Sequence, residues 1–108
     1  MKAYLIDPEK KEVTEVEYSG DYKDIYKLID CSTFQIVGIT PKGDGIYIDD
    51  EGLYAEKKHL WSFKGILFNN HLFNLINKGL VLGSNIVGDT IEPDLSLEEV
   101  KERVVWHW

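Results

Sequence analysis

Cysteine and arginine are the scarcest chemically active residues of this 108-residue chain, which holds one of each, Cys31 and Arg103. A single cysteine forms no internal disulfide, so the fold requires no oxidising compartment. With one arginine and a formal net charge of −7, the chain lacks the basic side chains that direct binding to a nucleic-acid backbone needs. No apolar run approaches the ~18 residues of a membrane span, and no signal-peptide pattern opens the chain. We therefore expect a cytoplasmic protein without a membrane partner.

The chain length favours one domain over residues 1–108, with a hydrophobic core large enough to fold without disulfides or a metal. The acidic excess lies at the two ends of the sequence, in residues 1–30 and 84–108. Such a surface either keeps a protein dissolved or faces a basic partner.

The first half of the sequence predicts two hairpins and one helix. Strands are expected over residues 2–6 and 13–18, joined by a turn that contains Pro8, and over residues 34–39 and 46–49, joined by a glycine-rich connection. Asp21 opens the expected helix as an acceptor for first-turn amides. Its apolar stripe has helical spacing and consists of Tyr22, Ile25, Tyr26 and Ile29.

The second half begins with an ambiguous apolar stretch, residues 60–68, which fits a strand, a short helix or a packed loop. A helix is expected over residues 71–77, a buried strand over 80–83 and a loop or hairpin tip over 84–89. Ser96 and Glu99 form a capping box that begins the last helix, and the tail 104–108 alternates like a strand. The sum is an α+β fold: a mainly antiparallel sheet with two or three short helices packed on one side.

Three consecutive carboxylates, Asp49, Asp50 and Glu51, end the fourth expected strand. The spaced acidic pattern of a calcium loop is absent, so we read the triplet as a solvated turn that binds no metal. The three histidines fit no zinc motif, and the glycine-rich segments lack a phosphate loop's lysine and following helix. No cofactor is expected.

The sequence also shows no recognisable combination of catalytic residues. Cys31 and the scattered histidines make no recognisable nucleophile and base, so the chain is not expected to be an enzyme. Asn85 and Asp89 could hold a small polar ligand, although hairpin tips share this composition. The tryptophans are either core or interface anchors or platforms for a nucleobase.

Three short stretches, Met1–Pro8, Ile48–Leu53 and Gly79–Gly83, resemble in this order a small family of uncharacterised proteins encoded mainly by phages, prophages and plasmids. The aromatic block 61–68 and the tail 106–108 are not part of that pattern. The resemblance implies a small accessory protein of a mobile element in a bacterial host cell. It supplies no catalytic residues.

Two functional hypotheses follow. In the first, the chain binds a host protein and inhibits it, with a component of anti-phage defence as the expected target. In the second, it binds a small ligand, such as a nucleotide signal, as a sponge. The candidate ligand- or partner-binding residues are Asp49, Asp50, Glu51, Trp61, Asn85, Asp89, Glu98, Glu99, Glu102, Trp106 and Trp108. Trp106 and Trp108 share one face of the tail and are expected to be buried in the core or in a homo-oligomer.

Overall fold

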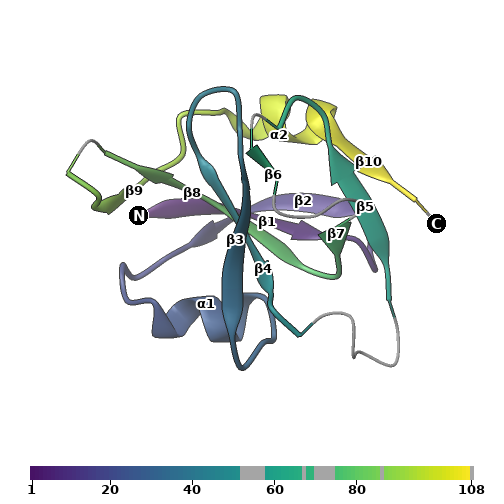
Figure 1. Ribbon diagram of the computed structural model, residues 1–108, viewed down its shortest axis with the longest axis horizontal. Coiled ribbons are helices and arrows are strands. Elements are labelled where there is room, and N and C mark those ends of the chain that lie inside the picture. Colours follow the sequence, from purple (N-terminus) through teal and green to yellow (C-terminus); the bar gives the residue numbers. More distant parts are fainter. Residues whose placement is uncertain (52–57, 67, 70–74, 86, 108) are drawn as a thin grey trace.

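The computed structural model describes residues 1–51, 58–66, 68–69, 75–85 and 87–107. These ranges contain ten strands and two helices, whose arrangement is drawn in Figure 1. In chain order they are β1 (Lys2–Asp7), β2 (Glu12–Glu17), α1 (Lys23–Leu28), β3 (Phe34–Ile39), β4 (Gly45–Asp49), β5 (Leu60–Phe63), β6 (Phe68–Asn69), β7 (Leu75–Ile76), β8 (Gly79–Ser84), β9 (Thr90–Ile91), α2 (Leu97–Arg103) and β10 (Val104–Trp106).

The larger sheet has the strand order β2-β1-β8-β4-β3-β6, and β9 pairs with the far end of β8. Every pair is antiparallel. Strand β8 lies between β1 and β4, so that Val81 is opposite both Tyr4 and Ile46. A late strand therefore joins the two early hairpins into one sheet.

A smaller sheet, in the order β10-β5-β7, packs beside the larger one. Trp61 of β5 is fully buried, and its indole N–H donates to the carbonyl of Asn77 at 2.7 Å. With Phe63 and Leu75, Trp61 belongs to a core cluster that also holds Ile46 and Val81 of the larger sheet. Burial of these large apolar side chains stabilises the contact between the sheets.

The larger sheet is covered on both faces. Val100 of α2 belongs to the same core cluster as Trp61 and Phe63 of the smaller sheet. Ile25 of α1 and Ile29, which caps the end of α1, pack with Leu80 and Leu82 in a second cluster. Neighbouring residues of a strand point to opposite faces, so the apolar run of β8 serves both clusters. Figure 1 shows α1 and α2 on opposite sides of this sheet.

The predicted α+β class, with two or three helices packed on one side, is therefore wrong. The described residues contain two helices, one on each face, and the smaller sheet lies on the same face as α2.

The helix expected over residues 71–77 is also wrong where the structure describes it, because Leu75–Ile76 is strand β7. Residues 71–74 of that prediction lie outside the described ranges. A strand at residues 75–76 can pair with β5, which a helix could not do.

Several local predictions are confirmed. Both early hairpins form. The stretch 60–68, for which a strand, a short helix and a packed loop were all left open, begins as strand β5. Ser96 and Glu99 form the capping box in full, and residues 104–106 form strand β10.

No helix in the described part of the chain is long and apolar enough to cross a membrane.

Candidate functional site

A cleft of about 170 Å³ opens where the turn after β1, the end of α1 and the end of β4 meet. We call it the acidic cleft. Its lining consists of Asp7, Pro8, Glu9, Ile29, Asp30, Asp49, His59, Asn77 and Lys78. Four of these residues carry carboxylates, and only Lys78 and His59 carry basic groups. The lining therefore has a net negative charge at neutral pH.

Turn chemistry places two of the carboxylates. Asp7 ends β1 and is largely buried; its Oδ1 accepts the N–H groups of Glu9 at 3.1 Å and Lys10 at 3.4 Å. Asp30 follows α1 with a left-handed φ of 51°, a conformation in which aspartate is enriched among non-glycine residues. Both residues thus lie at the ends of regular elements, and backbone N–H groups hold the carboxylate of Asp7.

Lys78 bridges the cleft. Its Nζ lies 2.6 Å from Oδ2 of Asp30. The hydrogen bond to Asp30, followed by the charges of Asp30, Asp7 and Glu9, raises the pKa of Lys78 against the opposing effect of burial. The ammonium group therefore remains charged at neutral pH.

Two hydrogen bonds between Asn77 and His59 hold the segment that carries Lys78 in position. Asn77 has a left-handed φ of 59°, and it exchanges hydrogen bonds with His59. The N–H of Asn77 donates to the carbonyl of His59, and the N–H of His59 donates to Oδ1 of Asn77, both at 2.9 Å. The indole N–H of Trp61 donates to the carbonyl of Asn77, and this hydrogen bond connects the pair to the core.

The predicted acidic triplet divides at the rim of the cleft. Asp49 is half-buried and lines the cleft, and its Oδ1 accepts the N–H of Glu51 at 2.9 Å. Asp50 and Glu51 are exposed, and the N–H of Asp50 donates to the carbonyl of Thr33. The triplet is thus a turn of which one residue, Asp49, lines the cleft. No three His, Cys, Asp or Glu side chains of the described residues are placed to hold a metal ion.

Four aromatic rings form a continuous row beside the cleft. Ring centroids are 6.0 Å apart for Tyr22 and Tyr26, 5.4 Å for Tyr26 and Phe34, and 5.7 Å for Phe34 and Tyr47. We call this set the aromatic row. Phe34 and Tyr47 pack on the second core cluster, whereas Tyr22 is 55% exposed. Phe34 is opposite Asp49 in the β3–β4 ladder, so the row and the cleft meet there.

Cys31 lies near both features and is half-buried. Burial, followed by the charges of Asp49 and Asp30, raises the pKa of its thiol to about 11. The thiol is therefore protonated at neutral pH, and a protonated thiol is a poor nucleophile.

The loop candidates Asn85 and Asp89 form the tip of the β8–β9 hairpin. Oδ1 of Asn85 accepts the N–H groups of Val87 at 3.1 Å and Asp89 at 2.9 Å, and the N–H of Asn85 donates to the carbonyl of Asp89. The amide oxygen of Asn85 thus maintains the turn itself.

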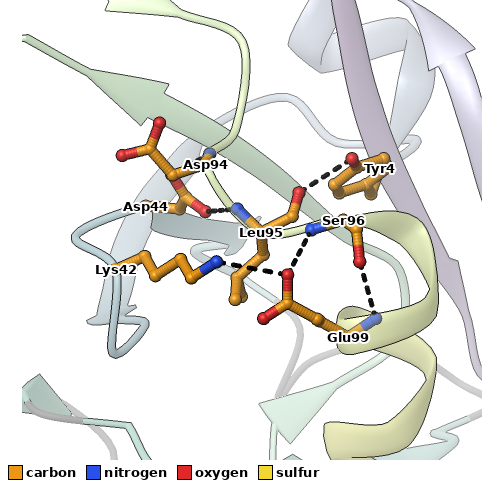
Figure 2. Close-up of polar contacts among 7 residues, drawn as sticks. All are labelled: Tyr4, Lys42, Asp44, Asp94, Leu95, Ser96 and Glu99. Carbon is orange, nitrogen blue, oxygen red and sulfur yellow. Dashed lines mark hydrogen bonds and ion pairs between the residues drawn. The ribbon is translucent and has the colours of Figure 1, made fainter.

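The three α2 candidates differ in their contacts. Glu99 completes the capping box with Ser96 and pairs with Lys42, as Figure 2 shows. Its Oε1 lies 3.3 Å from Nζ of Lys42. Glu98 pairs loosely with Lys101 at 3.9 Å, and Glu102 is exposed. Helix α2 lies on the sheet face opposite α1, so these carboxylates are separate from the acidic cleft.

The tryptophan candidates also occupy different settings. Trp61 is buried in the core. Trp106 is half-buried against the same core cluster and lines a hollow of about 400 Å³ with Val13 and Lys101. Trp108 lies outside the described residues.

Sequence reasoning missed Asp7, Glu9, Asp30 and Lys78 of the cleft, which come from three separate segments of the chain. It also missed Asp44, which is 1% exposed and accepts the N–H groups of Asp94 at 2.8 Å and Leu95 at 3.0 Å (Figure 2). The Asp7-Pro8 pair was a visible turn signal. No local signal predicted that Lys78 would face Asp30.

The family model described as "Domain of unknown function (DUF3846)" matches residues 1–104. The chain belongs to this family. The match includes every residue of the acidic cleft and of the aromatic row. No curated protein and no solved structure matches the chain.

Proposed function

We propose that this protein acts by binding, and that it captures a basic segment of a partner protein at the acidic cleft. The observation that carries the proposal is that Asp7, Glu9, Asp30 and Asp49, from three segments of the chain, line one cleft in which Lys78 pairs with Asp30. Carboxylates on a concave surface steer a cationic partner to it and fix its orientation.

The biological setting in this proposal comes from the sequence resemblance to proteins of mobile elements. On that basis the partner is a host protein, and inhibition of an anti-phage defence component is the proposed consequence. The protonated thiol of Cys31 supports binding rather than thiolate chemistry at this site.

The competing function, a sponge for a nucleotide signal, fits the geometry less well. A nucleotide's phosphates require cationic groups or free backbone N–H groups, whereas the cleft places four carboxylates against one ammonium group. In the Asn85 loop, the N–H groups of Asn85, Val87, Gly88 and Asp89 already donate within the hairpin tip.

The test compares three forms of the immobilised protein in a bacterial cell extract. The cleft variant is Glu9→Gln, Asp30→Asn and Asp49→Asn, which removes three charges while keeping side-chain size. Asparagine also tolerates the left-handed conformation of residue 30. The matched control, Glu12→Gln, Glu15→Gln and Asp94→Asn, removes three charges from exposed side chains outside the cleft.

We expect a host protein to be retained by the unmodified chain and the control, and to be lost from the cleft variant. Retention should also weaken as salt rises, because screening reduces the attraction between exposed charges. Equal retention by all three forms, release of a bound nucleotide instead of a protein, or turnover of a metabolite would contradict the proposal.

A further inference from the structure

We infer that the aromatic row is the second half of the docking surface and that it receives an arginine side chain of the partner segment. This inference rests on the proposed function and specifies its partner. The row extends from half-buried Tyr47 on the sheet to exposed Tyr22, the residue that precedes the first turn of α1. The exposure of the rings therefore increases from Tyr47 to Tyr22, and the row adjoins the cleft at Asp49.

Packing on the core holds the two inner rings of the row in place before any partner arrives. Phe34 and Tyr47 pack on the cluster that includes Ile25 and Leu80. Tyr22 and Tyr26 meet nearly edge to face, at an interplanar angle of 87°. Each ring thus limits its neighbour's rotation, and a preorganised surface loses less conformational entropy on binding.

The charges around the row determine which ligand it fits. At the Tyr22 end lie Asp21 and Asp24, whose side chains accept the N–H groups of Lys23 and Ser19, both at 3.0 Å. The hydrogen bond with Ser19 lowers the pKa of Asp24, so this carboxylate is ionised at neutral pH. At the other end, Asp49 is opposite Phe34. Carboxylates thus flank the rings at both ends, and the nearest cation whose effect is resolved is Lys27 of α1, which also lowers the pKa of Asp24.

This combination selects a cation with a flat, weakly hydrated head. A guanidinium group stacks on aromatic rings and also donates in pairs to carboxylates, whereas an ammonium group is compact and strongly hydrated. A nucleic-acid strand would also offer flat rings to the row, but its phosphates would be repelled by the flanking aspartates. The geometry therefore favours arginine in a peptide.

The experiment uses three fluorescein-labelled peptides of alternating glycine with arginine, lysine or citrulline, and an oligothymidine strand. Citrulline keeps the flat shape of arginine and lacks its charge. Binding is measured by fluorescence anisotropy for the unmodified chain, for Tyr22→Leu, and for Val87→Ala as a control at another exposed apolar residue. Thermal melts check that each variant is folded.

We expect the arginine peptide to bind more tightly than the lysine peptide, and the citrulline peptide to bind weakly. Tyr22→Leu should weaken arginine binding about two- to fivefold, the effect of one exposed cation–π contact, and should change lysine binding less. Val87→Ala should leave both unchanged.

Two sets of results separate the inference from the function on which it rests. Equal affinity for arginine and lysine peptides, with no effect of Tyr22→Leu and a clear loss in the cleft variant, would overturn the inference and leave the binding function standing. No binding of any basic peptide, or tighter binding of oligothymidine, would overturn both.

Discussion

Gly79 at the start of β8 lies directly against the indole ring of Trp61 in β5. A Cβ atom at residue 79 would be 2.6 Å from Cζ2 of Trp61 and 3.1 Å from Cη2. Both residues are buried, and the contact joins the larger sheet to the smaller one. The close approach of the two sheets at this point thus depends on a residue without a side chain.

Replacing Gly79 by alanine should destabilise the protein by about 1–3 kcal/mol, the usual cost of overpacking a well-filled core. The measurement is urea unfolding followed by tryptophan fluorescence. Gly45→Ala is the control, because its Cβ would meet its nearest neighbour at an ordinary 3.4 Å. That control should keep or slightly raise the stability. An unaltered unfolding midpoint in Gly79→Ala would show that the ring can move freely.

Asp44 should be essential to the segment that leads into α2. Its two carboxylate oxygens each accept one backbone N–H, from Asp94 and Leu95. In Asp44→Asn one oxygen becomes an NH₂ donor that faces another donor, and the loss should be about 1.5–3 kcal/mol in the free energy of unfolding. Asp94→Asn, a change of an exposed side chain, should be near neutral. Equal stability of the two variants would contradict this role.

Glu99 should make the stability of the protein depend on pH in the acid range. The N–H of Ser96 and the ammonium group of Lys42 lower the pKa of Glu99 below its usual 4.5. A carboxyl with a lowered pKa in the folded state stabilises the protein fully above its unfolded pKa. That contribution disappears as the pH falls through the folded value. The Tm difference between the unmodified chain and Glu99→Gln should therefore be larger at pH 7 than at about pH 3.

The variant Lys42→Met provides the check on this assignment. Because Lys42 is one cause of the lowered pKa, its removal should reduce the pH dependence without abolishing it, since the Ser96 hydrogen bond persists. A Tm difference between the unmodified chain and Glu99→Gln that stays constant from pH 7 to acid would argue against the assignment.

Lys78 should act as an internal competitor for the partner's cation. It already pairs with Asp30 inside the cleft, so Lys78→Met should raise the affinity for the arginine peptide about two- to fivefold, as expected for one partly exposed ion pair. Lys64→Met, an exposed lysine outside the cleft lining, is the matched control. A loss of affinity in Lys78→Met would mean that the lysine helps to hold the partner.

The sequence by itself determined the local structure wherever a short signal was sufficient. Alternation and turn residues predicted the hairpins β1–β2 and β3–β4, and Ser96 with Glu99 predicted where α2 begins. These features depend on interactions between residues close together in the chain, such as a side-chain oxygen with an amide three residues away.

The tertiary structure decided which elements cover the two faces of the larger sheet and which charged residues lie together in the acidic cleft. The apolar run of residues 80–82 indicated a buried strand, but only its position between β1 and β4 placed Leu80 and Val81 in different core clusters. The same holds for the cleft, where Asp7, Asp30 and Lys78 come together across long stretches of chain. Periodicity reports which side chains are buried, whereas contacts between distant segments depend on strand order. In this protein the strand order assembled the candidate site.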